Sequence, residues 1–285
     1  MYYSNSVSTD SIRELVRNNA RYRAKLWFTN LRLGNNNIIT AHVTKVEVIE
    51  VSGLEHAGQR NVLRVNNVDY AFRWCPAGSF MMGNPPRQVL VTLSRGFWML
   101  ETPVTQAMWE SVMGNNLSHF RGATLPVERV SWNDAQQFVG RLNELGVAPS
   151  GFRFSLPTEA QWEYACRAGT TTAFSFGDTL TREQANFGVS IGQTSEVGRF
   201  PANAWGLRDM HGNVSEWCQD WFGDYPSGAV TDPTGPSTGS FRVHRGGCWN
   251  SFDMHCRSAS RSGIDPTSRR AIIGLRIALV AEEPR

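Results

Sequence analysis

Residues 245–276 have the sequence RGGCWNSFDMHCRSASRSGIDPTSRRAIIGLR. Arg, Gly and Trp form a regular frame in this stretch, and the gaps between them hold aromatic, aliphatic, acidic, basic and small polar side chains. A half-buried strand alternates apolar and polar residues, and an amphipathic helix repeats its apolar residues with a period near 3.6. The stretch shows neither pattern. We therefore predict a loop-rich segment in which the frame holds the backbone while the gap side chains face outward.

The composition of the whole chain is that of a globular protein with many turns. Its 285 residues suffice for a large domain with its own core, and ten Trp and 26 Gly favour a turn-rich fold over a helical bundle. The formal net charge of +3 is small, and Lys and Arg are scattered along the chain. Nucleic-acid binding is therefore not expected.

The sequence contains no recognisable export signal and no membrane span. Residues 1–16 have neither an apolar core nor a basic leader, and no later stretch approaches 18 consecutive apolar residues. The sequence as given is compatible with a cytoplasmic protein and with a cell-surface protein whose export signal has been removed, so we leave the localisation open.

The N-terminal quarter predicts a small accessory piece. Residues 10–26 place apolar side chains at helical spacing after the potential caps Thr9 and Asp10, residues 39–51 alternate as a strand does, and residues 62–74 form two short runs split by a turn. No set of chemically active residues occurs here. We therefore predict an accessory α+β segment over residues 1–71 and a principal domain over residues 72–285.

Capping patterns predict three helices in the principal domain. One begins after Thr105, a second begins after the Ser131 capping box, and a third begins after the Thr158 box and stops at Gly169. Beyond Gly169, turn residues recur every few positions, which indicates a loop-dominated half.

Six motifs, taken in order, resemble the formylglycine-generating enzyme family, whose members are also called sulfatase-modifying factors. The motifs are WCPAGSFMMG (74–83), GFWMLETPVTQAMWESVM (96–113), LPVERVSWNDAQQFVGRLN (125–143), FRFSLPTEAQWEYACRAG (152–169), GLRDMHGNVSEWCQDWF (206–222) and RGGCWN to IGLRIAL (245–279). The resemblance implies an α+β, loop-rich variant of the C-type lectin fold with two helices on a small twisted antiparallel sheet. The helices expected at 132–145 and 159–168 match that pair.

The resemblance also implies a copper-dependent oxidase, but the catalytic cysteine pair is not matched. The position of the first family cysteine is Ser251, and the nearest counterpart of the second is Asp253 or Met254. Thiolates are the ligands that Cu(I) needs, so we expect neither copper nor enzyme activity. The six His residues are dispersed, which also argues against the iron site of a related branch. The five Cys, an odd number without a CxxC pair, are expected to be free buried thiols.

The frame of 245–276 further resembles the variable region of proteins that are diversified by retroelements. The frame residues are Arg245, Gly246, Gly247, Trp249, Cys256, Arg257, Ser258, Ala259, Arg261, Pro266, Arg269, Ile273, Gly274 and Arg276. The gap residues are Asn250, Ser251, Phe252, Asp253, Met254, His255, Ser260, Ser262, Gly263, Ile264, Asp265, Ser268, Arg270, Ala271 and Ile272. This resemblance implies a non-catalytic, receptor-type protein whose gap residues bind a ligand.

A broad patch of loop residues suits a protein ligand better than a small molecule, and such a ligand could be presented on another cell or surface. Two alternatives stay open at this point: an oxidase of the generating-enzyme type, and a degenerate scaffold member of that family whose face is constant.

The stretch DMHGNVSEW (209–217) carries a further implication of the family resemblance. Matching family positions bind calcium, which assigns a structural Ca²⁺ to Asp209, Gly212, Val214 and Glu216. The alternative is a glycine-rich turn in which Glu216 pairs with an Arg of the scaffold.

Overall fold

The computed structural model describes residues 22–33, 39–50 and 55–282, and the chain divides into two compact units, Met1–His56 and Ala57–Arg285. In the first unit, strand β1 (Tyr22–Leu33) pairs antiparallel with β2 (Ile39–Glu50). The strand predicted over residues 39–51 is confirmed. The helix predicted over 10–26 lies partly outside the described residues, and from Tyr22 onward it is wrong, because residues 22–33, which include the aromatic residues Tyr22, Trp27 and Phe28, form a strand paired with β2.

The principal domain begins earlier than predicted. The hairpin of β3 (Arg60–Val65) and β4 (Val68–Cys75) turns at Asn66 and Asn67, both with positive φ, as a tight primed turn requires. The buried residues of β4 are Tyr70, Phe72, Trp74 and Cys75. Because β4 supplies core residues and pairs with a central strand of the main sheet, the domain boundary lies near residue 57 and not at 71/72.

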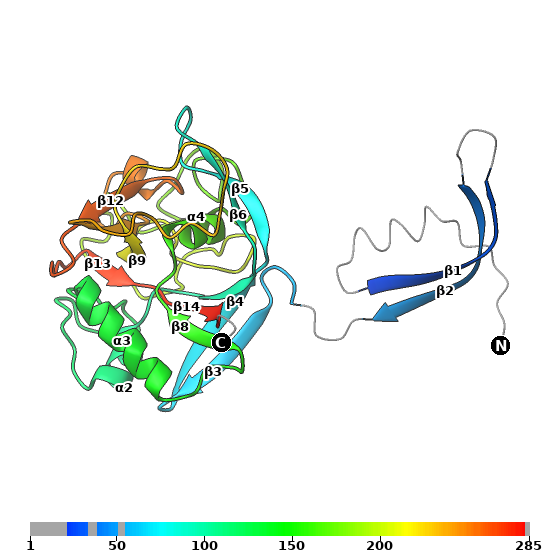
Figure 1. Ribbon diagram of the computed structural model, residues 1–285. Helices are drawn as coiled ribbons and strands as arrows, with labels where there is room; N and C mark the ends of the chain where they lie inside the picture. The colour runs from blue at the N-terminus through cyan, green and yellow to red at the C-terminus, as the bar shows by residue number, and fades with distance from the viewer. Residues whose placement is uncertain (1–21, 34–38, 51–54, 283–285) are drawn as a thin grey trace. The chain divides into compact units, whose positions relative to one another are not determined.

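Three sheets build the principal domain (Figure 1). The five-stranded sheet has the order β3-β4-β7-β14-β8 and adds β7 (Phe97–Leu100), β8 (Phe152–Ser155) and β14 (Ala278–Ala281). The four-stranded sheet has the order β12-β11-β9-β13 and consists of β9 (Ser215–Trp221), β11 (Arg242–Arg245), β12 (Arg261–Ile264) and β13 (Ile273–Leu275). The three-stranded sheet consists of β5 (Gly78–Met82), β6 (Val89–Leu93) and β10 (Val230–Thr231). Pairing is antiparallel apart from β13 with β9 and β10 with β6.

The three predicted helices are present with their capping boxes. They are α2 (Gln106–Met113), α3 (Trp132–Glu144) and α4 (Glu159–Arg167). The third ends slightly earlier than predicted, because Ala168 already takes the left-handed conformation ahead of Gly169. Helices α2 and α3 join through stacked rings of Trp109 and Phe138, whose centroids lie 5.1 Å apart. The fold is therefore the predicted α+β arrangement, with α4 packed against β5, β9 and β11.

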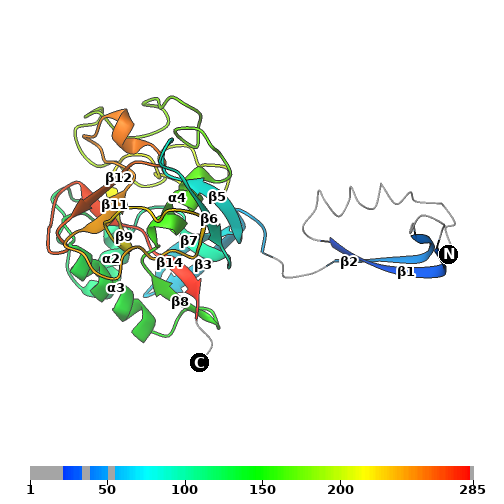
Figure 2. The same cartoon turned by 45° about the horizontal axis from the view of Figure 1, so that its top comes forward.

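The half after Gly169 consists of loops, short strands and the 3₁₀ turn η1 (Asp253–Cys256), as predicted. In both views the orange segment that carries η1 lies on the side of the domain away from β8 (Figure 1, Figure 2). Among the helices of the described residues, none has the length and apolar character that crossing a bilayer needs.

Candidate ligand-binding face

Most frame residues of 245–276 are buried, whereas Trp249, Arg261 and Pro266 are half-buried and Arg257 and Arg269 are exposed. None of the gap residues is buried, and Phe252 and Met254 are 72% and 54% exposed. The buried frame residues are Arg245, Gly246, Gly247, Cys256, Ser258, Ala259, Ile273, Gly274 and Arg276. We refer to the surface formed by the gap residues as the gap face.

Two glycines of the RGG motif allow the segment to pass close to the core. Gly246 and Gly247 have φ values of 93° and 68°, a region that L side chains rarely adopt. A Cβ atom on Gly247 would lie 2.6 Å from the sulfur of Cys256, and one on Gly246 would lie 3.0 Å from the ring of Trp162. Only glycine fits both positions without rearrangement of the neighbours.

The buried side chain of the frame residue Arg245 holds the backbone in the middle of the segment. Its guanidinium is fully buried and forms ion pairs with Glu163 and, at 3.2 Å, with Glu159, both on α4. It also donates to the carbonyls of Ser258 (3.2 Å) and Ser260 (2.6 Å). The backbone around gap residue Ser260 is therefore held by a side chain that solvent does not reach.

Three further frame arginines hold the rest of the segment by two-pronged bonds to carboxylates. Arg261 donates twice to Glu159 (2.7 Å each), and Arg269 donates twice to Asp134 (2.8 and 2.7 Å). Arg276 donates twice to Glu216 (2.9 and 2.8 Å). Paired planar bonds of this kind fix orientation as well as position.

His211 holds the base of η1, a role that its isolated place in the sequence did not indicate. Its ring is buried, Nδ1–H donates to the carbonyl of Cys256 (2.8 Å), and Nε2 accepts from the backbone N–H of Ser175 (3.1 Å). Burial lowers the pKa of His211 to about 4, so the ring is neutral at pH 7. The only sequence signal for this contact was the DMHGN turn itself.

Gly263 has less room for a side chain than we predicted for a gap position. A Cβ atom at this residue would lie 2.7 Å from Cγ and 2.8 Å from Cβ of Phe222. Both contacts are close to the backbone of Phe222, so a rotation of its ring alone does not make room. Substitution at Gly263 requires a shift of β12 or of residue 222.

The two thiols of the segment, Cys248 and Cys256, are buried. The hydroxyl oxygen of Ser251 accepts from the backbone N–H of Cys248 at 3.1 Å. All five Cys are buried free thiols, as predicted, and burial raises the pKa of Cys248 and raises that of Cys256 to about 12. Within the described residues, no three His, Cys, Asp or Glu side chains converge as metal ligands would.

Of the four residues predicted to bind calcium (Asp209, Gly212, Val214 and Glu216), Glu216 is bonded to scaffold side chains, whereas Oδ1 of Asp209 is buried without a hydrogen-bond partner. Both oxygens of Glu216 accept from Arg276, and Oε2 also accepts from the indole of Trp162 (2.6 Å). Arg276 also donates to the carbonyls of Leu100 and Arg208 (2.8 Å each). The carboxylate of Glu216 is thus already neutralised by a scaffold arginine, which is the alternative that the sequence left open.

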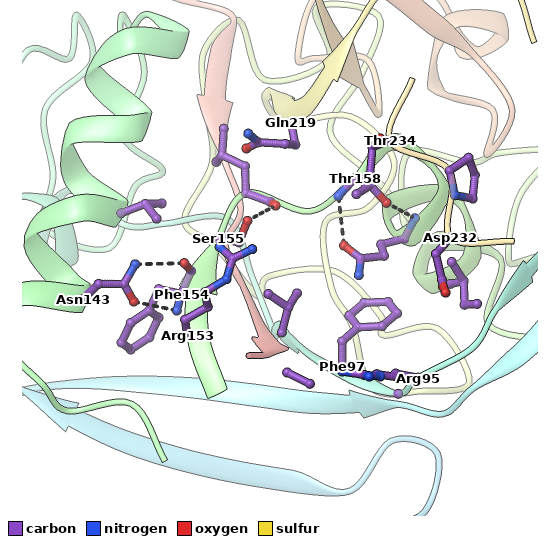
Figure 3. A pocket seen from close by; sticks show the side chains of 18 of the residues that line it. Arg95, Phe97, Asn143, Arg153, Phe154, Ser155, Thr158, Gln219, Asp232 and Thr234 are labelled. Carbon is purple, nitrogen blue, oxygen red and sulfur yellow. Dashed lines mark hydrogen bonds between the residues drawn. The ribbon is translucent and has the colours of Figure 1, made fainter. Parts of the chain in front are cut away.

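A cleft of about 700 Å³ lies between α3, β8 and the loop after β6 (Figure 3). Polar side chains such as Arg153, Ser155 and Gln219 line it. Asn143 of α3 donates to the carbonyl of Phe154 (3.0 Å) and accepts from its N–H (2.8 Å), so the free edge of β8 is closed to another strand. The cleft is separate from the gap face, because no residue of 245–276 lines it.

Comparison with known proteins identifies the domain. The family model of the sulfatase-modifying factor enzyme 1-like domain matches residues 66–281. The formylglycine-generating enzyme of Mus musculus is 36% identical over 200 residues, which cover 64% of this chain and 50% of that protein. The serine/threonine-protein kinase pkn1 of Chlamydia caviae is 37% identical over 158 residues, which cover 54% of this chain and 24% of that protein. The chain therefore spans only a quarter to a half of these two relatives.

A solved structure with the same fold is Treponema denticola variable protein 1. It superposes with a TM-score of 0.71 at 30% identity, covering 77% of this chain and 98% of that chain. The variant of the C-type lectin fold expected from the motifs is confirmed by this match together with that of the family model.

Proposed function

This chain belongs to the sulfatase-modifying factor enzyme 1-like domain family, and from that premise we propose that it is a non-catalytic protein that binds a protein ligand through the gap face. We further propose that a retroelement diversifies the gap residues. The name of the Treponema denticola variable protein, together with its similarity in fold and sequence, supports this reading.

The proposal rests on a difference between the two classes of residue: most frame residues are buried or paired with carboxylates elsewhere in the domain, whereas no gap residue is buried. The frame arginines use carboxylates outside the segment, namely Asp134, Glu159, Glu163 and Glu216. Because exposed side chains without such partners usually change stability by less than about 0.5 kcal/mol when replaced, the exposed gap residues can change while the fold persists, whereas Ile264 and Ile272 pack against the core. A diversified binder needs this combination.

The chemistry of the gap face suits a protein surface. Phe252 and Met254 are exposed apolar side chains of the kind enriched in protein interfaces, and Asp253 and His255 lie beside them in the chain. The residues lie on an outward-facing loop, whereas small molecules prefer concave pockets.

The contacts of the thiols support a non-catalytic role. A thiolate is the reactive and metal-binding form of cysteine, and burial keeps the thiols of Cys248 and Cys256 protonated. Ser251, which takes the place of the first catalytic cysteine, has an ordinary hydroxyl in a hydrogen bond to the backbone. The thiol pair on which the oxidase chemistry depends has no counterpart at these positions.

A library of variants tests the proposal. Each gap position and each frame position of 245–276 would be randomised singly, displayed on yeast and scored for resistance to protease. We expect gap positions other than Gly263, Ile264 and Ile272 to accept most residues and the buried frame positions to accept few. Equal tolerance in the two classes contradicts the proposal, and so does conversion of a cysteine peptide to an aldehyde by the purified protein.

A further inference from the structure

Two loops outside residues 245–276 are hydrogen-bonded to the backbone of the gap face. In the first loop, Gly188 N–H donates to the carbonyl of Ser251 (2.8 Å) and Val189 N–H donates to that of Trp249 (2.9 Å). In the second loop, Arg129 N–H donates to the carbonyl of Arg270 (3.1 Å). Both loops therefore border the gap face, and neither belongs to the segment that we propose to be diversified.

Val189 and Arg129 share an unusual backbone conformation. Their φ values are 60° and 58°, in the left-handed region. The other described non-glycine residues in this region are Asn66, Asn67, Ala168, Asp209, Asn213 and Asp232. Asn and Asp tolerate this conformation, and Ala168 ends a helix, whereas a β-branched residue such as Val189 is a genuine outlier.

Burial of the side chain does not offset this strain. The side chain of Val189 is 57% exposed, and that of Arg129 is also exposed. Glycine or asparagine would serve the backbone better at both positions. Residues with strained backbones cluster at functional sites, among them ligand-binding sites.

The first loop extends the apolar part of the gap face. Val189 and Ile191 (38% exposed) lie on the loop, and Phe252 and Met254 lie on the segment to which that loop is hydrogen-bonded. The loop GVSIG (188–192) contains no charged residue. These four exposed apolar side chains belong to two backbone segments that are hydrogen-bonded to each other.

The second loop adds unpaired positive charge. In the part of the chain that the structure describes, no carboxylate lies within 4.0 Å of the guanidinium of Arg129 or of Arg270, whereas Arg261 and Arg269 of the frame are both paired. Arg129 and Arg270 are both exposed, so an acidic group on a partner would reach either guanidinium.

From these contacts we propose that Val189, Ile191 and Arg129 form an invariant rim of the gap face, which selects protein ligands that present an apolar side chain next to acidic residues. This inference rests on the proposed function, because it assigns a ligand class to the same face. Trp249 connects the two parts of the rim: its carbonyl accepts from Val189, and its indole donates to the carbonyl of Ala271 (3.2 Å) beside Arg270.

The test uses the full chain and three fluorescein-labelled peptides: one Phe flanked by Glu residues, the same peptide with Ser in place of Phe, and the same peptide with Lys in place of Glu. Binding is measured by fluorescence anisotropy at several salt concentrations. We expect the first peptide to bind about tenfold more tightly than either analogue. Equal binding of the three peptides overturns the proposed ligand class.

The variants Val189→Asn and Arg129→Asn separate a binding role from a structural one. Asparagine suits the left-handed backbone, so we expect Tm to be unchanged or raised by up to about 4 °C. We expect each variant to weaken binding of the first peptide about three- to tenfold. Arg129→Asn should also reduce the dependence of binding on salt, and Val189→Asn should leave it unchanged.

Leu90→Asn and Arg95→Asn are matched controls, because both residues are exposed and lie on β6 or the loop after it, outside the gap face. They should leave the affinity unchanged. If Phe252→Ser weakens binding while Val189→Asn and Arg129→Asn do not, the rim is wrong and the proposed function stands. If none of the three changes binding, both are wrong. A fall in Tm for both rim variants also overturns the argument, since it shows that the side chains serve the fold.

Discussion

Replacement of one frame arginine should destabilise the fold far more than replacement of one gap arginine in the same segment. We compare Arg245→Leu with Arg270→Leu. The side chain of Arg245 is 0% exposed and is paired with Glu163, whose side chain is also 0% exposed. Arg270 is exposed, and in the described chain it has no ion pair or side-chain hydrogen bond.

The expected magnitude follows from the charges left behind. Without Arg245, Glu163 keeps its pair with Arg167 but loses a buried partner, and Glu159 keeps only Arg261. Breaking a buried ion pair from one side costs about 3–5 kcal/mol, whereas an exposed substitution usually stays within about 0.5 kcal/mol. For a domain of this size, the first change lowers Tm by about 6–20 °C.

The assay is urea unfolding followed by tryptophan fluorescence, with Tm from differential scanning calorimetry. Arg245→Leu combined with Glu163→Gln should not recover the loss, because the second change removes the carboxylate partner of the buried Arg167. A loss below about 1 kcal/mol for Arg245→Leu, or an equal loss for Arg270→Leu, would refute the reasoning that the frame carries the fold and the gap residues do not.

Four further outcomes are expected. Gly263→Ala should lower stability by about 1–3 kcal/mol through its clash with Phe222, and Phe222→Gly should relieve the added loss because it removes both Cβ and Cγ; equal losses in both backgrounds would contradict that clash. The pKa of His211 is about 4 in the folded protein and near 6.5 in the unfolded chain, so the contribution of His211 to stability is present above pH 6.5 and is lost as the pH falls towards 4. The difference in stability between the parent and His211→Asn should therefore shrink over that pH range by up to about 3 kcal/mol. A difference that stays constant with pH would contradict this prediction. Because Glu216 is neutralised by an arginine, addition of EGTA should leave Tm unchanged, and a drop in Tm would restore the calcium prediction. Addition of Cu(I) should also leave Tm unchanged in the parent and in Ser251→Ala, and stabilisation of the parent alone would contradict the absence of a copper site.

Local signals in the sequence predicted the parts of the fold that depend on neighbouring residues. The boxes at Thr105, Ser131 and Thr158 specify helix starts because each cap bonds to a backbone N–H three residues on. The Asn66-Asn67 turn specifies the hairpin for the same local reason.

Features that depend on contacts between residues far apart in the sequence were harder to predict. The boundary near residue 57 depends on the pairing of β4 with β7, and the limit on Gly263 depends on Phe222, a residue far away in the sequence. The calcium prediction for Glu216 did not account for Arg276, which lies 60 residues further on. Long-range partners of this kind leave no periodicity or spacing to detect.

The partition of 245–276 was predictable in outline, because side chains without periodicity that are set in a regular frame indicate exposure. The contacts that hold the frame residues in place could not be predicted from the sequence. The carboxylates that hold the frame arginines come from α3, α4 and β9, and His211 holds η1 from a separate turn.

The most direct measurement is the sequence of the gene in several sibling isolates, with the 245–276 coding region compared with the rest. The account predicts that substitutions concentrate at the gap positions, with Gly263 the least variable of them, while the frame, Val189 and Arg129 stay fixed. If 245–276 varies no more than its surroundings, the diversified face is wrong, and the protein is a family member with a constant surface.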